Sequence, residues 1–156
     1  MRFHLLFLFI PLLLSCSDKG DLVTTEPTNA DVAGRYELSS TYFNSSIDDE
    51  ISSKSSSIYI ELEKNGTLML HNFPVVPETD SKSYSIERFH TGIGTYTIAP
   101  LGSNSTTEFY GLYLKCGDLP NPCDTPRLRK DGDRLMLSFE YFNGDFTQRM
   151  VFTRSQ

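Results

Sequence analysis

The strongest constraint on the fold is an alternation of apolar and polar residues that runs from Gly34 almost to the end of the chain. Tyr36 and Leu38 alternate with charged or polar neighbours, and Ile60 and Leu62 do the same further along. A period of two is typical of β-strands with one buried face, and no segment shows a convincing helical period. The sequence therefore predicts an all-β domain.

Pairs of turn-forming residues divide this pattern into short strands. Asn65-Gly66, Asp131-Gly132 and Asn143-Gly144 each stand between two alternating runs, and such pairs favour the two positive φ angles of a tight hairpin. Eight or nine antiparallel strands must then close into an up-and-down barrel, or stack as a two-sheet sandwich. The expected strands cover residues 35–39, 58–63, 67–73, 84–89, 94–98, 109–115, 127–130, 135–142 and 146–154.

The N-terminus carries the pattern of an export signal. An apolar run of about 12 residues (3–14) is too short for a transmembrane helix, which needs roughly 20. The run ends in Leu13-Leu14-Ser15-Cys16, which resembles the lipobox of bacterial lipoproteins. The resemblance implies cleavage before Cys16, acylation of this cysteine by palmitate-type chains and an envelope location. Ser17 at the next position favours the outer membrane, and an ordinary secretory signal with a chance cysteine is the alternative.

These features predict three segments. Residues 1–15 form the signal peptide, residues 16–33 carry the lipidated cysteine and a flexible tether, and residues 34–156 form the β-domain. We expect the tether to stay flexible because it is rich in polar residues and Pro and poor in apolar ones. The Ser-rich stretch 43–57 is expected to be a long loop over one opening of the barrel, either a lid or a plain surface loop.

Short motifs in the β-domain resemble those of lipocalin-like domains. Gly34-Arg35-Tyr36 stands where these domains open with Gly-x-Trp or Gly-x-Tyr, and Gly94-Thr95-Tyr96 looks like an internal second copy. The segment 151–154 looks like their closing strand. The resemblance implies that a C-terminal arginine lies over the ring of the opening motif. We therefore expect Arg154 to pack on Tyr36 by a cation–π contact and to close one end of the barrel, the alternative being a solvated Arg154.

The apolar side chains of the inner face either fill the barrel or line a cavity for one small apolar ligand. Inward tyrosine hydroxyls at 36, 110 and 141 need hydrogen-bond partners, which favours a pocket that holds water or ligand. The candidate lining residues are Tyr36, Leu38, Ile60, Leu62, Tyr110, Leu112, Leu137 and Phe139, and Leu114 and Phe152 share their face.

The cysteines predict one structural cross-link. Once Cys16 is lipidated, Cys116 and Cys123 are the remaining pair of the three cysteines, and a disulfide is their expected state in an oxidising envelope. Closing this short Pro-rich loop is worth roughly 2.5 kcal/mol in the chain-entropy model. The spacing differs from the Cys-x-x-Cys of redox-active pairs, so a structural role is favoured.

Charge and motif content limit the function classes. A net charge of −6 argues against nucleic acid as a partner. His71 and His90 have no second ligand at a metal-binding spacing, and nucleophile and phosphate-binding motifs are absent, so no metal, cofactor or catalytic residue is predicted. We expect a non-enzymatic envelope lipoprotein that binds a small apolar or amphipathic ligand. The alternative is a protein-interaction module such as an inhibitor or immunity-type lipoprotein, for which the 4 basic and 10 acidic residues of segment 16–64 are a hint.

Overall fold

The computed structural model describes residues 20–76, 85–104, 107–117, 124–143 and 146–156. No helix in these ranges has the length and apolar character needed to cross a membrane. The helical segments are α1 (Asn29–Val32), α2 (Ser45–Ser52) and the 3-10 helix η1 (Ser55–Ser57). The strands are β1 (Asp21–Leu22), β2 (Gly34–Tyr42), β3 (Tyr59–Leu62), β4 (Thr67–Val75), β5 (Arg88–Asn104), β6 (Thr107–Lys115), β7 (Arg127–Asp131), β8 (Arg134–Asn143) and β9 (Phe146–Arg154).

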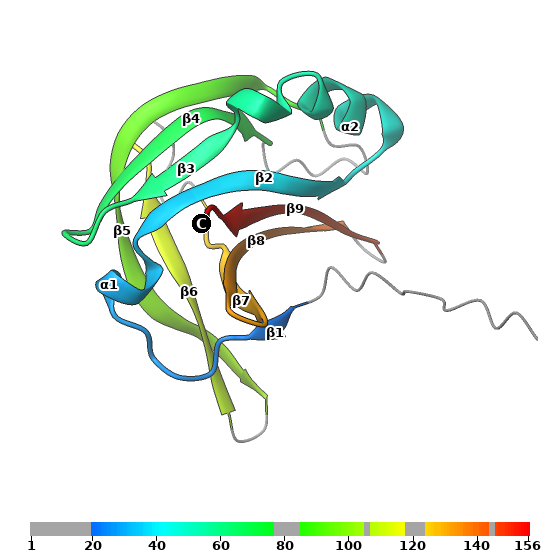
Figure 1. Cartoon of the computed structure of the whole chain (residues 1–156). Helices are drawn as coiled ribbons and strands as arrows, with labels where there is room; N and C mark the ends of the chain where they lie inside the picture. Colours follow the sequence, from blue (N-terminus) through cyan, green and yellow to red (C-terminus); the bar gives the residue numbers. More distant parts are fainter. Residues whose placement is uncertain (1–19, 77–84, 105–106, 118–123, 144–145) are drawn as a thin grey trace, which may run out of the picture.

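Strands β2 to β9 form a closed antiparallel up-and-down barrel (Figure 1). Each strand pairs with the next along the chain, and β9 also pairs with β2, which closes the ring. Where the first and last strands meet, Tyr36 is the register partner of Arg154 and Leu38 that of Phe152. The predicted barrel is confirmed, and the sandwich alternative is wrong because one sheet contains all the strands.

Two of the predicted hairpins lie within the described residues. Gly66, before β4, and Gly132, before β8, have positive φ angles of 88° and 59°. Asn65 does not share the positive φ that a two-residue turn would need; instead its side-chain oxygen accepts a hydrogen bond from the Thr67 N–H at 2.8 Å. The loop therefore spans residues 63–66 and is longer than predicted. The third predicted turn includes residue 144, which lies outside the described residues.

One long strand replaces two that the sequence predicts separately. The strand β5 is 17 residues long and includes residues 94–98 with the end of segment 84–89. Its first part pairs with β4 and its second part with β6. A Cβ on Gly94 would lie 1.9 Å from the carbonyl oxygen of Lys115. This glycine therefore permits close strand approach, where the sequence pattern suggested a strand boundary. Residues 85–87 are not in a strand, and residue 84 lies outside the described residues.

Residues 20–33, expected to be a flexible tether, belong to the folded domain. Leu22 pairs with Arg129 on β7, and Val23 is only 7% exposed within the core. Thr28 caps α1 in a reciprocal capping box with Asp31, and the side chain of Val32 is fully buried. The tether prediction is wrong here because each buried unit is too short to show a periodic pattern. Residues 16–19 lie outside the described residues.

The Ser-rich stretch 43–57, expected to be a long loop, contains α2 and η1. The Asn44 side chain caps α2 by accepting from the Ile47 N–H at 3.1 Å. Ile47 and Ile51 lie four residues apart and are 4% and 0% exposed, so one face of α2 joins the core. Because α1 precedes β2 and α2 follows it, the helices lie at opposite ends of the barrel (Figure 1). The stretch is a packed helical cover.

Substitution of Ile51 tests this packing. We expect Ile51→Ala to lower the free energy of unfolding by roughly 2–4 kcal/mol, because the isoleucine is fully buried. Glu50→Ala on the exposed side of α2 is the matched control and should change it by less than about 0.5 kcal/mol. Urea denaturation followed by circular dichroism measures both. Equal stabilities of the two variants would mean that the stretch is a loosely attached loop.

Candidate functional site

The candidate ligand-lining residues lie in the barrel core and pack against one another. Leu38 and Tyr110 are partly buried against the core cluster, and the other six belong to it. Leu114 and Phe152 are also members of the cluster. Six of the eight are at most 3% exposed: Tyr36, Ile60, Leu62, Leu112, Leu137 and Phe139.

Three phenylalanine rings occupy the middle of this core. The centroids of Phe73, Phe139 and Phe152 lie 5.2 to 5.9 Å apart, which is direct ring contact. The sequence pattern does not mark Phe73 as inward, because in an ideal strand it would lie on the opposite side from Leu70. Asn72 has a φ angle of 48° in a bulge of β4, and this shifts the alternation by one residue.

The inward tyrosine hydroxyls all donate to protein groups. Tyr36 donates to the carbonyl oxygen of Val32 at 2.6 Å, and burial raises the pKa of its hydroxyl. Tyr141 donates to a carboxylate oxygen of Asp124 at 2.9 Å. Tyr110 donates to a neighbouring carboxylate at the barrel rim at 3.3 Å. Because all three hydroxyls have protein acceptors, they do not require water or a ligand inside the barrel.

Arg154 closes the α1 end of the barrel by a contact that differs from the predicted one. Its Nη1 donates to the carbonyl oxygen of Asp31 at 2.9 Å, and its Nε lies 2.7 Å from the position of a Cβ on Gly34. The cation–π contacts of the described residues involve other cations. The predicted packing on Tyr36 is wrong because Gly34, having no side chain, lets the guanidinium reach α1.

The barrel wall is completed by the N-terminal segment between β6 and β7. In the described part of these strands, Gly111 and Arg127 form the single ladder pair. Further toward the α1 end, the Val23 N–H donates to the carbonyl oxygen of Leu128 and its carbonyl accepts from the Tyr110 N–H, both at 3.0 Å. Val23 therefore bridges two wall strands that no longer pair with each other.

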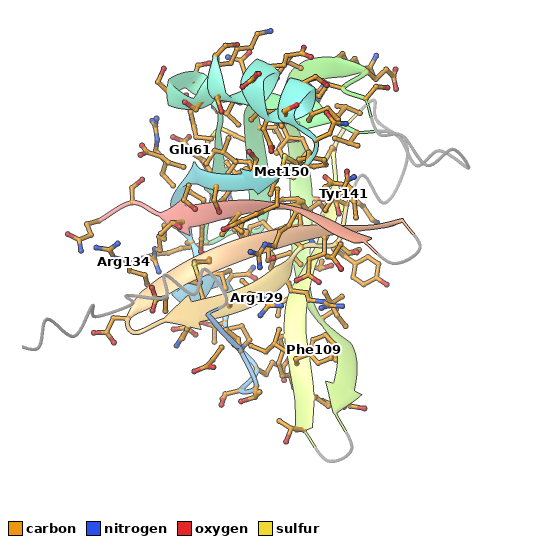
Figure 2. All side chains as sticks on the ribbon, turned by 90° about the vertical axis from the view of Figure 1, so that its right-hand side faces the viewer. Glu61, Phe109, Arg129, Arg134, Tyr141 and Met150 are labelled. Carbon is orange, nitrogen blue, oxygen red and sulfur yellow. The ribbon has the colours of Figure 1, made fainter. Side chains whose placement is uncertain are left out.

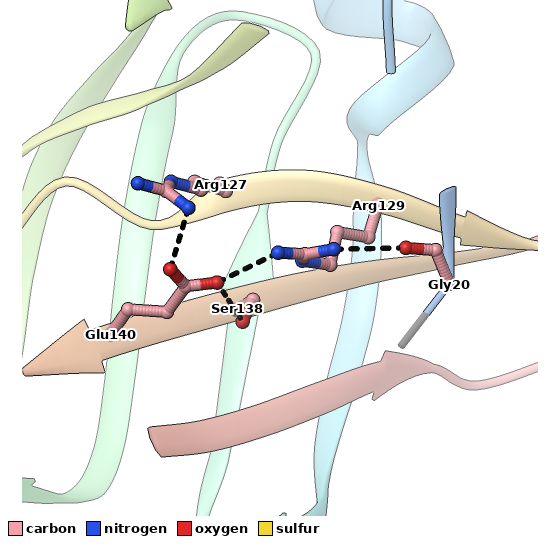
Figure 3. A network of polar contacts seen from close by, with 5 residues as sticks. All are labelled: Gly20, Arg127, Arg129, Ser138 and Glu140. Atoms are coloured by element: carbon pink, nitrogen blue, oxygen red, sulfur yellow. Dashed lines mark hydrogen bonds and ion pairs between the residues drawn. The ribbon is translucent and has the colours of Figure 1, made fainter. Parts of the chain in front are cut away.

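An ion network outside the wall holds this segment in place (Figure 3). The Glu140 carboxylate, whose side chain is 9% exposed, contacts Arg127 Nη1 at 2.7 Å and Arg129 Nη2 at 2.9 Å. Ser138 donates a further hydrogen bond to Glu140 at 3.2 Å. Arg129 Nη1 donates to the carbonyl oxygen of Gly20 at 3.0 Å. The network thus ties residue 20 to β7 and β8.

Three surface pockets lie along the N-terminal segment. One of about 670 Å³ lies between residues 21–27, the turn after β7 and Arg154. Others of about 480 and 400 Å³ lie against residues 96–98 of β5 and against Phe109 and Arg129. None of the candidate lining residues lines these three pockets, each of which is bounded by part of segment 20–29.

A carboxyl with a raised pKa, Asp124, lies at the α2 end. Asp124 Oδ2 accepts the hydrogen bond from Tyr141, and its Oδ1 accepts from the Thr125 N–H at 2.7 Å. Burial raises the pKa of Asp124 to about 6, although both hydrogen bonds act to lower it. The Phe43 ring lies 5.7 Å from that of Tyr141. A pKa of about 6 means that Asp124 changes its protonation state near pH 6.

No sequence motif marked Asp124, because its environment comes from three separate elements. It follows the segment between Cys116 and Cys123. Cys116 is 2% exposed, whereas Cys123 lies outside the described residues, so their pairing stays a prediction. Among the described residues, no three His, Cys, Asp or Glu side chains are grouped to hold a metal ion.

Comparison with known proteins adds no assignment. No family model matches the chain, and neither a curated protein nor a solved structure matches it.

We expect Asp124→Asn to remove part of the pH dependence of stability. A carboxyl with a folded-state pKa raised from 3.8 to about 6 holds its proton more tightly when folded. The contribution of Asp124 to the free energy of unfolding is therefore greatest below about pH 4 and is lost as the pH rises through about 6. When the pH is raised from 4 to 7.5, the free energy of unfolding of the variant should rise relative to that of the wild type by on the order of 2 kcal/mol. Asp133→Asn, at an exposed turn, is the control, and an equal shift in it would contradict the assignment.

Proposed function

We propose that the chain is a lipid-anchored envelope protein, acylated at Cys16, whose lipocalin-like barrel is a non-enzymatic protein-interaction module. The observation that carries this proposal is the packing of the barrel. The candidate lining residues and the three phenylalanine rings contact one another in the core. A helix lies at each end of the barrel, which leaves the outside of the sheet as a large surface open to a partner.

One outer face is the best candidate for partner contact. The β5–β6 face consists of the exposed residues Ile93, Thr95, Thr97, Tyr113 and Lys115. Ile93 and Tyr113 are 69% and 45% exposed, which is high for large apolar side chains. Thr95 pairs with Lys115 and Thr97 with Tyr113, so the residues form one continuous strip. Exposed apolar groups with a polar rim are typical of interaction surfaces.

Photo-crosslinking in intact cells tests this face. We expect p-benzoylphenylalanine at position 93 or 113 to give the same discrete adduct, because both positions would lie under one partner. The same group at Glu37, an exposed position on β2, is the control and should give none. Ile93→Asp should abolish the adduct formed at position 113. A lack of adducts at both positions would overturn the assignment of this face.

A second candidate function is binding of a small amphipathic ligand at the α2 end. The observation that favours it is Asp124, whose pKa is raised to about 6 by burial and which accepts a hydrogen bond from Tyr141, whose ring lies 5.7 Å from that of Phe43. Titration with the apolar fluorophore N-phenyl-1-naphthylamine separates the candidates. The interaction module predicts no saturable binding. Saturable 1:1 binding that Asp124→Asn weakens would support the second candidate over the first.

Mass spectrometry tests the anchor and the cross-link. We expect detergent-extracted protein to begin at Cys16 with three acyl chains, as the resemblance to lipoproteins implies. Peptide mapping without reductant should find Cys116 joined to Cys123, and Cys16→Ser should release the chain from the membrane fraction. An unmodified Cys16 would overturn the anchor, and free thiols in envelope protein would overturn the disulfide.

A further inference from the structure

The proposed anchor would hold one side of the barrel close to the bilayer. Gly20 is fixed to the wall by the hydrogen bond from Arg129, and the next two residues pair with β7. Cys16 precedes Gly20 by four residues. A residue spans at most about 3.6 Å, so the lipid-bearing residue lies within about 14 Å of Gly20. A reach this short brings the wall near Gly20 to the lipid headgroups.

The wall at this point is rich in arginine, although the chain as a whole has a net charge of −6. Outward positions are those that alternate with the buried Leu128, Leu137 and Phe152. Two of the outward positions that the structure describes in β7, β8 and β9 carry carboxylates, Asp131 and Glu140. Glu140 is held between two arginines, so that trio keeps a positive charge. Four of these outward positions are arginines: Arg127, Arg129, Arg134 and Arg149.

An exposed aromatic ring extends the same surface. Tyr42, at the end of β2, is 42% exposed and is the register partner of Arg149. The Arg149 guanidinium carbon lies 4.6 Å from the centre of the Tyr42 ring. Tyrosine is enriched at membrane–water interfaces, where its ring lies at headgroup level. We define the β7–β9 face as the four arginines together with Tyr42. Figure 2 views the molecule from the side on which Arg129 and Arg134 lie.

We propose that the β7–β9 face lies against the anionic phospholipid headgroups of the bilayer that holds the Cys16 lipid. This inference rests on the proposed lipid anchor. The short connection, the attachment of Gly20 to Arg129 and the sign of the charge all favour the same side of the barrel. In the eight-stranded ring, β5 is four strands from β9, which carries Arg149, and β6 is four strands from β2, which carries Tyr42. The β5–β6 face therefore lies across the barrel from Tyr42 and Arg149, although β6 neighbours β7.

The absence of tryptophan from the sequence makes a clean depth measurement possible. Tyr42→Trp and Tyr113→Trp each introduce one tryptophan, on the proposed membrane face and on the opposite face. The acylated full chain is reconstituted into phosphatidylcholine vesicles with 30% phosphatidylglycerol and brominated lipid. We expect at least about twofold quenching and a blue shift for Tyr42→Trp, and little change for Tyr113→Trp. Equal quenching of the two, or none at position 42, would overturn the orientation.

Charge reversal tests the electrostatic part. In the Tyr42→Trp chain, Arg134→Glu with Arg149→Glu should reduce quenching to the level of the Tyr113→Trp chain. The matched control reverses Arg88 on β5 and Lys115 on β6, both exposed and across the barrel from Arg149 and position 42, and should leave quenching unchanged. Arg134→Glu alone is the second variant, because this side chain is exposed and its loss leaves Arg149 in place beside the ring at position 42. Unchanged quenching in both Arg134 variants would overturn the role of charge.

Flotation separates the two proposals. A chain that does not float with vesicles of either composition lacks the anchor, which overturns the proposed function and this inference together. A chain that floats without quenching at position 42 keeps the anchor and overturns only the orientation. Quenching at position 42 that is weaker in pure phosphatidylcholine supports the anionic headgroup as the contact.

Discussion

The backbone of Val23 supplies the hydrogen bonds on which closure of the barrel depends. A closed sheet must pair the N–H and C=O groups of neighbouring strands, because an unpaired buried group costs about 1–3 kcal/mol. Strands β6 and β7 separate beyond Gly111, and Val23 pairs with both of them. The N-terminal segment is therefore part of the wall, and the fold begins upstream of the first long strand.

Backbone carbonyl groups also find hydrogen-bond partners at the end of the barrel that α1 covers. A short helix leaves its last carbonyl groups without partners inside the helix. The Asp31 carbonyl accepts from Arg154 and the Val32 carbonyl accepts from Tyr36. Residues from the first and last barrel strands thus bind the same helix end. At the other end α2 inserts two isoleucines, and between the two ends the phenylalanine rings occupy the centre.

Sequence reasoning succeeded where structure repeats over several residues. Alternation located most barrel strands and most of the inward side chains, because an inner face produces the same pattern along every strand. It failed where one or two residues determine the local structure. The signals for α2 were an asparagine cap and the spacing of Ile47 and Ile51, too few for a helical period. Phe73 was missed because a single bulge at Asn72 reverses the alternation.

Long-range contacts account for the rest of the difference. Ser138 and Glu140 alternate with the inward Leu137 and Phe139, so the pattern is compatible with an outer position, but it carries no sign that they and Arg129 are largely buried. Their environment includes Gly20, which is 109 residues from Arg129 in the sequence. Asp124 likewise takes its raised pKa from burial among elements that are distant along the chain. Local patterns give the side of a strand on which a residue lies, and they do not give what covers it.

The main effect of the ion network between β7, β8 and Gly20 is to fix the register in which β1 pairs with β7. Buried ion pairs seldom stabilise a fold more than apolar packing would, because desolvation opposes the attraction. A slip of one residue in the pairing of β1 with β7 would turn Val23 out of the core. The same slip would move the Gly20 carbonyl away from Arg129 and leave that guanidinium without one of its acceptors. The network therefore selects one register for β1, and with it the position of Gly20 on the barrel wall.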